Sequence, residues 1–276
     1  MLKFSFNSTT LREMDVFQAL QHIHACGYDG VELMLNATRL HPLHTPAARI
    51  AEIGHFCNDN DIQIVCVAAG GDRLLSEIPY QPPIIDGEES GRRKCIDFLK
   101  RSIEIAQLLG APVLNFNSGP PQQGTSPSQA WGFIRDGVTE LLKVSGDLVL
   151  ALEPEPDFFI GTTVDALRLI REIDDPGFRL NLDIGHVNCS EDDCYGAIER
   201  AMPFTRHIHI EDIKGRVHHH EIPGEGDIDF TRVFEILEKA QYSDFVSVEL
   251  HHHNEIWQRA LKESLDYLQN LQRVHV

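Results

Sequence analysis

The sequence predicts an eight-stranded parallel (β/α) barrel. Short apolar and β-branched segments alternate with longer amphipathic ones along the whole chain. Sharing the 276 residues among eight repeats leaves about 34 residues for each, enough for one strand and one helix. Strict alternation implies parallel strands joined by right-handed crossovers. An open doubly wound sheet is the alternative, but no Gly-x-Gly-x-x-Gly motif follows the first strand. We expect a single domain over residues 1–276.

Each expected strand is a short run rich in Val, Ile, Leu and Phe: residues 2–7, 30–35, 62–69, 112–117, 148–153, 178–185, 206–212 and 245–250. Amphipathic patterns predict helices over 15–27, 88–110, 162–174, 229–240 and 255–271, and glycines end two of them. Two irregular stretches, 70–90 and 119–129, follow strands. We expect them to form parts of a lid over the C-terminal face, with ordinary surface loops as the alternative.

Composition narrows the function classes. The chain is 42% hydrophobic and 24% charged, with a formal net charge of −18. This charge disfavours nucleic acid as a partner, and no apolar run is long enough to span a membrane. The N-terminal residues do not resemble a secretory signal, so we expect a cytoplasmic protein. Six scattered cysteines without Cys-x-x-Cys spacing are expected to be reduced packing residues. A small polar substrate fits these properties.

Strand phase places ionisable side chains inside the barrel. In residues 148–153, the leucines occupy one face and the opposite face ends in Glu153. The same phase in the next three expected strands directs Asp183, His209 and Glu249 inward, near the C-terminal ends. Three converging carboxylates would repel strongly in a barrel interior. A divalent cation would remove this repulsion, because carboxylates and an imidazole are suitable ligands for one. Interior salt bridges are the alternative.

Several motifs resemble the xylose-isomerase-like barrel superfamily: GYDGVEL at 27–33, LALEPEP, LNLDIGHV, HIHIEDIKG and VSVEL. That superfamily includes sugar isomerases and epimerases, polyol and keto-acid dehydratases, and type IV abasic-site endonucleases. The resemblance implies that Glu153, Asp183, His209 and Glu249 bind one metal ion, Mn²⁺ first, with Co²⁺, Zn²⁺ or Mg²⁺ as alternatives. It also implies that Glu153 and Glu249 are the catalytic acid and base.

The implied activity is isomerisation or epimerisation of a ketose or related polyol, by proton transfer through a metal-stabilised cis-enediolate. A dehydratase of a cyclic polyol or keto acid is the alternative. The resemblance further implies a homodimer or homotetramer. It places His186, Glu155, Arg216 and Lys214 on the substrate. Glu32 is expected to face inward, either toward the substrate or bracing the barrel floor or a lysine, and Asn117 is a candidate to hydrogen-bond a polyol. Asn7 and Asn115 are additional hydrogen-bonding candidates for a polyol.

The segment VHHHEIPGEGDIDF supports a third hypothesis. His218 and His220 resemble the His-containing loop of the abasic-site endonucleases and could hold an extra metal ion. The site would then be a multinuclear zinc centre that hydrolyses phosphodiesters. Asn117 stands where those enzymes have a histidine, and the charge of −18 suits DNA badly. We expect His251 to His253 to form a polar rim, with a trapped Zn²⁺ or Ni²⁺ as the alternative.

Overall fold

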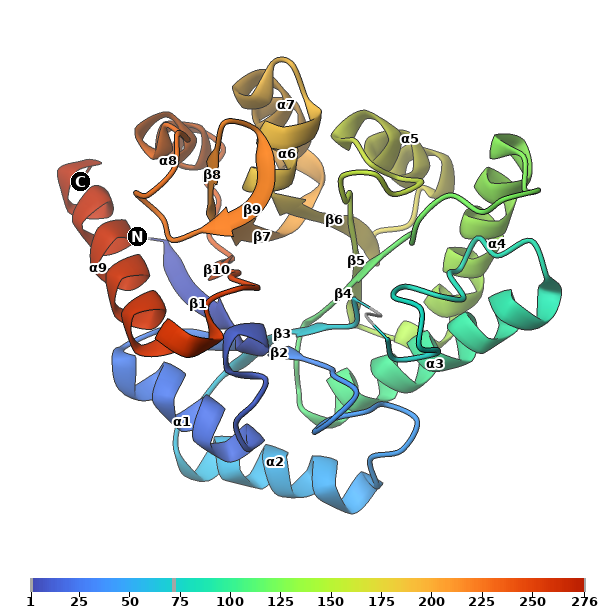
Figure 1. The fold of residues 1–276 in the computed structure, drawn as a ribbon, viewed down its shortest axis with the longest axis horizontal. Helices are drawn as coiled ribbons and strands as arrows, with labels where there is room; N and C mark the ends of the chain where they lie inside the picture. Colours follow the sequence, from blue (N-terminus) through green and yellow to red (C-terminus); the bar gives the residue numbers. More distant parts are fainter. Residues whose placement is uncertain (1, 71–72, 276) are drawn as a thin grey trace.

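The protein is described here from a computed structural model that covers residues 2–70 and 73–275. Eight parallel strands close into a barrel, which confirms the predicted fold (Figure 1). Around the barrel their order is β1-β10-β7-β6-β5-β4-β3-β2. Their bounds are β1 (Lys3–Asn7), β2 (Gly30–Met34), β3 (Ile64–Ala68), β4 (Val113–Asn117), β5 (Val149–Glu153), β6 (Phe178–Asp183), β7 (Thr205–Ile210) and β10 (Phe245–Val248). This order puts β5 and β10 on different walls, separated by β6 and β7.

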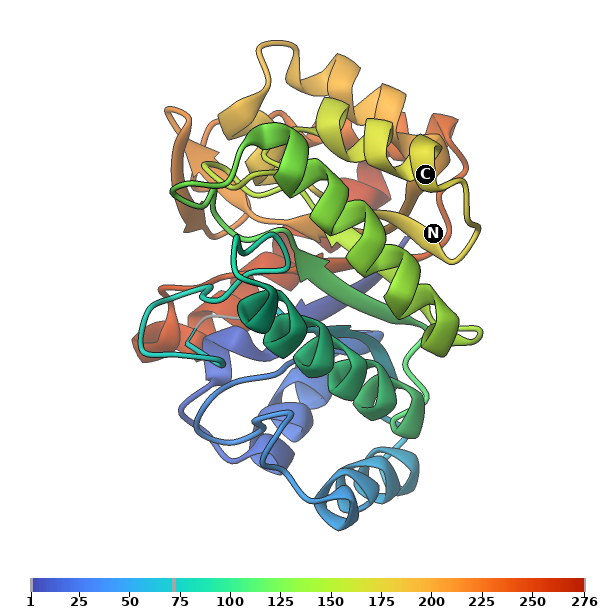
Figure 2. The ribbon, with the colours of Figure 1, turned by 90° about the vertical axis from the view of Figure 1, so that its right-hand side faces the viewer.

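Helices surround the barrel on its outside (Figures 1 and 2). They are α1 (Val16–Cys26), α2 (Ala47–Asp59), α3 (Glu89–Leu108), α4 (Pro127–Ser145), α5 (Thr163–Ile173), α6 (Ile184–Ser190), α7 (Cys194–Ala201), α8 (Phe230–Lys239) and α9 (Trp257–His275). Short 3₁₀ turns occupy Ser8–Leu11, Met202–Phe204 and Asn254–Ile256. Among the described residues, no helix is both long and apolar enough to cross a membrane.

Local signals explain where the helices begin and end. The Asp15 carboxylate caps α1, and Gly27 ends that helix with a φ of 103°. Ser126 and Gln129 form a capping box at the start of α4. The helix therefore begins at Pro127, and the prediction that residues 127–129 are irregular was wrong. Residues 71 and 72 of the other expected lid segment lie outside the described residues.

The barrel interior has an apolar floor and a polar mouth. Val65, Cys66, Val113 and Ala151 form a small buried cluster inside, while Leu150 and Leu152 pack outward into the main core. All six cysteines are free. The polar residues at the strand ends lie above the apolar floor, so the expected strand phase is what the barrel shows.

A hairpin that the sequence reasoning did not predict follows β7. It consists of β8 (Asp212–Lys214) and β9 (Val217–Glu221), which pair antiparallel. The turn residues Gly215 and Arg216 have φ values of 60° and 61°, as a tight two-residue hairpin turn requires. In Figure 2 the hairpin lies at the same end of the barrel as the segment 73–87.

Asp212 holds this hairpin to the chain that follows it. Its buried carboxylate accepts hydrogen bonds from the backbone N–H groups of Gly224, Ile228 and Ile213, at 2.9, 3.1 and 2.9 Å. We expect Asp212→Ala to lower the free energy of unfolding by about 2–3 kcal/mol, because it leaves buried donors unpaired. Urea denaturation would measure this change.

The matched control is Asp227→Ala in the same region. Asp227 is exposed and its side chain accepts one backbone bond, from Gly215 at 2.8 Å. Its removal is expected to cost less than about 1 kcal/mol. Equal losses in the two variants would show that Asp212 does not anchor the hairpin.

Candidate metal centre and active site

Glu153, Asp183, His209 and Glu249 come together at the mouth of the barrel, and we call them the four-ligand cluster. One potential ligand atom from each lies within 4.8 Å of the others. Glu153, Asp183 and His209 belong to β5, β6 and β7, and Glu249 directly follows β10. All four are buried. The structure therefore brings together the residues that strand phase selected, while metal binding itself stays a prediction.

His209 is oriented by a carboxylate deeper in the barrel. Its Nε2 lies 2.9 Å from both carboxylate oxygens of Glu32, and its Nδ1 lies 2.9 Å from Glu153 Oε1. Burial alone would lower the pKa of His209, but the negative charges of Glu32 and Glu249 hold it well above its usual value. The ring thus presents Nδ1 to the carboxylates of the cluster and Nε2 to Glu32.

Each glutamate of the cluster is held by an asparagine from the neighbouring strand. Asn115 Nδ2 donates to Glu153 Oε2 at 2.8 Å, and Asn7 Nδ2 donates to Glu249 Oε1 at 2.9 Å. β4 pairs with β5, and β1 pairs with β10, so the same device occurs on two different walls. Asn7 and Asn115 therefore orient the glutamates, each with one of its two amide N–H donors.

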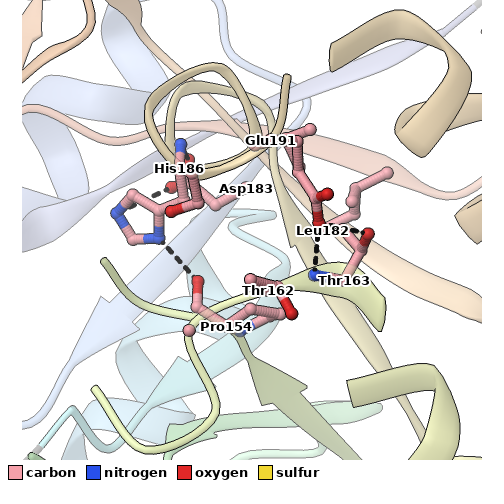
Figure 3. A pocket seen from close by; sticks show the side chains of 10 residues that line it. Pro154, Thr162, Thr163, Leu182, Asp183, His186 and Glu191 are labelled. Atoms are coloured by element: carbon pink, nitrogen blue, oxygen red, sulfur yellow. Dashed lines mark hydrogen bonds and ion pairs between the residues drawn. The ribbon is translucent and has the colours of Figure 1, made fainter. Parts of the chain in front are cut away.

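Asp183 ends β6 and caps α6. Its Oδ1 accepts the backbone N–H of His186 at 2.7 Å, whereas its Oδ2 is buried without a hydrogen-bond partner among the described residues. Figure 3 shows His186 beside Asp183, with the His186 ring directed at the Pro154 carbonyl. That bond, from Nδ1, is 2.9 Å long. A buried carboxylate oxygen without a donor is costly, and a bound cation would satisfy it.

The cluster as a whole fits a divalent cation. Burial alone would lower the pKa of His186, but the negative charges of Asp183, Glu155 and Glu153 raise it to about 9. Added positive charge at the strand ends would therefore reduce the repulsion between the buried carboxylates. Three carboxylates with one imidazole form a donor set that Mn²⁺, Co²⁺, Zn²⁺ and Mg²⁺ accept. The Glu32 contact to His209 is the outer support that metal-binding histidines usually have.

β9 brings a group of histidines to the same mouth. His218 and His220 project from one face of this strand, and their Nε2 atoms lie 3.0 Å apart. His220 Nδ1 donates to the Glu249 carbonyl at 3.0 Å. Burial lowers the pKa of His218 to about 4 and that of His220 to about 3, so both rings are neutral. Together with His186 they offer three nitrogens within 4.8 Å of one another.

Three further histidines, His219, His251 and His252, form part of the rim of the barrel mouth. His219 stacks on His252, with ring centroids 5.1 Å apart. His251 Nε2 lies 3.4 Å from Glu249 Oε2. His251 therefore contributes to the charge balance of Glu249, in addition to forming part of the polar rim that was expected for residues 251–253.

A cavity of about 530 Å³, which we call the main cavity, opens above the four-ligand cluster. Glu153, Glu249, Glu155 and His218 line it. Burial raises the pKa of the Glu155 carboxyl to about 7. The volume lies within the usual range of small-molecule pockets, roughly 300–1,000 Å³. Glu155 is therefore placed where a substrate contact was expected.

Two of the expected substrate contacts, Lys214 and Arg216, are corrected by the structure, and Glu32 takes the alternative position at the barrel floor. Glu32 is fully buried beneath the cluster, where it accepts bonds from His207 and His209. Lys214 is exposed on the hairpin, and Arg216 stands at the hairpin turn and donates to the carbonyls of Cys189 and Glu191. The antiparallel hairpin turns both basic residues away from the main cavity.

Asn117 lines the main cavity, but its side chain already joins two loops. Nδ2 donates to the Gly70 carbonyl at 3.2 Å, and Oδ1 accepts the Gly119 N–H at 3.2 Å. Both expected lid segments are thus tied to the end of β4. Asn117 shapes the cavity wall, and its role in substrate binding remains a prediction.

Sequence reasoning missed several residues of the cavity wall, among them Arg12, Arg73 and Tyr80. Each lies in a segment that follows a strand, β1 for Arg12 and β3 for the other two. Position after a strand was the available signal, because loops after barrel strands meet at one end. The absence of a local basic cluster in the sequence hid the two arginines, which come from separate loops.

Comparison with known proteins identifies the family of this chain. A family model described as "Xylose isomerase-like TIM barrel" matches residues 20–271. A putative hydroxypyruvate isomerase of Mus musculus is 26% identical over 163 residues, which are 55% of this chain and 58% of that protein. The fructoselysine 3-epimerase of Shigella flexneri is 22% identical over 244 residues, covering 87% of this chain and 86% of the relative.

A solved structure of the IolI protein with a bound zinc atom has the same fold. Its TM-score is 0.81 at 19% identity, and the match covers 98% of each chain. At this identity the likeness concerns the fold alone. The family model, in contrast, spans most of the chain and includes all four residues of the cluster. The chain belongs to the xylose isomerase-like TIM barrel family.

Proposed function

We propose that this protein is a divalent-metal-dependent isomerase or epimerase that acts on a ketose or related polyol. The observation that carries the proposal is the placement of Glu153 and Glu249 on different walls of one buried cluster. Relatives named as a 3-epimerase and an isomerase support this reaction class.

Glu153, Asp183, His209 and Glu249 would hold the metal ion, with Mn²⁺ as the proposed native metal. When bound, such an ion polarises a carbonyl and the adjacent hydroxyl and so acidifies the neighbouring C–H bond. Asp183 Oδ2 makes no hydrogen bond among the described residues, since His186 Nε2 and His209 Nδ1 lie 3.6 and 3.7 Å away, and it is available for this task. Glu32 keeps His209 Nδ1 directed at the cluster.

The two glutamates would move the proton. Asn115 holds Oε2 of Glu153, and Asn7 holds Oε1 of Glu249. The other carboxylate oxygen of each glutamate is directed toward the interior of the cluster. A carboxylate on one side of a substrate can remove a proton, and one on the other side can return it to the opposite face. This arrangement favours epimerisation over the dehydratase alternative, which needs the first transfer only.

The histidines of β9 support a second candidate. His186, His218 and His220 offer three nitrogens in one small volume, and His186 Nε2 is buried without a hydrogen-bond partner among the described residues. If these three bind a second ion, the site is a multinuclear centre suited to hydrolysis of a phosphodiester. The number of metal ions per chain separates the two candidates.

Metal content provides the first test. We expect about one Mn²⁺, Co²⁺ or Zn²⁺ per chain in protein purified without a histidine tag, measured by plasma mass spectrometry. Glu249→Gln should lower this content, because it removes one carboxylate ligand. Glu235→Gln, on the exposed face of α8, is the matched control.

Two or three zinc ions per chain, reduced by His220→Gln, would instead favour the multinuclear hydrolase. Wild-type protein that holds no metal even after reconstitution would contradict both candidates.

Glu32 provides a test of the support beneath the cluster. We expect Glu32→Gln to weaken metal binding by about 10–100-fold, because His209 loses its anionic partner. Competition with a chelator would measure the affinity. Ser247→Ala is the control, since Ser247 contacts His207 at 3.1 Å and is bonded to Ser5. Equal affinity in wild type and Glu32→Gln would show that Glu32 has no role in orienting His209.

Proton exchange tests the reaction itself. In D₂O, the Mn²⁺-loaded enzyme should exchange the proton beside the carbonyl of D-fructose, D-tagatose or L-ribulose, observed by NMR. Glu153→Gln should lower this rate by at least about 100-fold. Metal content measured on the same samples separates loss of the base from loss of the ion. Failure to exchange a proton on any ketose would argue against the proposal.

A further inference from the structure

A second cavity lies beside the main cavity. It has a volume of about 540 Å³ and we call it the side cavity. The loop after β5 provides much of its wall through residues 156–159, and the end of α6 and the hairpin turn complete it. His218 lines both cavities. A ligand that passes over His218 can therefore occupy the two cavities at once.

Two side-chain contacts lie where the cavities adjoin, Tyr80 with Phe158 and Glu155 with His218. Tyr80 lines the main cavity and packs edge-on against Phe158 of the side cavity, with ring centroids 4.9 Å apart. Glu155 lines the main cavity just before the loop turns into the side cavity, and its Oε1 lies 3.9 Å from His218 Nε2. The residues nearest the reacting centre are thus continuous with those of the side cavity.

The chemistry of the side cavity suits a neutral polyhydroxyl group. Phe158 and Phe159 offer aromatic surface, and Asp157 offers a carboxylate that has no hydrogen-bond partner among the described residues. A carboxylate accepts hydrogen bonds only, so it selects for hydroxyl donors and against anions. Aromatic rings provide rigid apolar surface for the C–H faces of a sugar ring.

The one arginine of the side cavity is already engaged. Arg216 Nη2 donates to the carbonyls of Cys189 and Glu191, both at 3.1 Å, and Nη1 lies 3.4 Å from Asp192. No other Lys or Arg is among the described residues that line this cavity. A phosphate or carboxylate would therefore meet Asp157 and Asp165 without a free cation.

We propose that the substrate is a two-part molecule, a ketose that carries a second, neutral sugar unit. The ketose occupies the main cavity over the four-ligand cluster, and the second sugar occupies the side cavity against Phe158 and Asp157. The inference rests on the proposed function, because it places the reacting ketose over that cluster.

The test compares D-fructose with isomaltulose, a fructose that carries glucose on its terminal hydroxyl. Isothermal titration calorimetry on the Mn²⁺-loaded protein would measure both affinities. We expect isomaltulose to bind about tenfold more tightly than fructose, the equivalent of about 1.4 kcal/mol. Phe158→Ala and Asp157→Asn should each reduce this ratio, and Asp157→Asn, which lies outside the main cavity, should leave the affinity for fructose within about twofold of wild type. The matched control is Asp147→Asn, an exposed residue before the opposite end of β5.

Absence of isomaltulose binding, or equal affinity for the two sugars, would overturn the inference. If Phe158→Ala and Asp157→Asn lowered the affinity for both sugars equally, this would also overturn the inference, because these residues would then affect only the shape of the main cavity. Proton exchange in D₂O, recorded for both sugars, reports on the proposed function separately. A tenfold preference without exchange would support the two-part ligand and count against the isomerase.

Discussion

The charge of the four-ligand cluster constrains everything around it. Parallel strands in a closed barrel all end on the same face, so inward carboxylates at their ends must meet. Glu153, Asp183 and Glu249 are buried within a few ångströms of one another, where their repulsion is weakly screened. His209 neutralises part of this charge but is itself shared with Glu32. The donor set of the cluster therefore suits an added cation, and hydrogen bonds from Asn115 and Asn7 hold two of the carboxylates in place.

The strand pattern of the sequence was sufficient to predict the barrel and the four residues of the cluster. Inward-facing residues of a half-polar strand follow a period of two, so the leucines of β5 locate Glu153 without any three-dimensional information. Depth along the barrel was not predictable in the same way. Glu32 faces inward as expected, but it lies low enough to contact His207 and His209. Its level depends on how β2 is staggered against its neighbours, which the pattern of a single strand does not record.

The hairpin shows a different limit. Lys214 and Arg216 follow β7 in sequence, and the expectation was that they point at the substrate. Two residues with positive φ reverse the chain at Gly215 and Arg216, and β9 then returns toward the barrel. The same reversal directs His218 and His220 inward and leaves His219 to stack on His252. Arginine is unusual at a turn position with positive φ, so the residues of this turn gave little indication that the chain reverses here.

The loop after β5 joins the chemistry of the site to its choice of ligand. The last residue of β5 is Glu153 of the cluster, and the next six residues include Glu155 of the main cavity and Phe158 and Phe159 of the side cavity. Pro154 fixes the start of this loop, and its carbonyl accepts the His186 bond that positions α6 beside Asp183. Because Asn115 and Asn7 hold the two glutamates from neighbouring strands, the cluster is anchored by the barrel, while the residues beyond Glu155 are free to differ in shape and so set specificity.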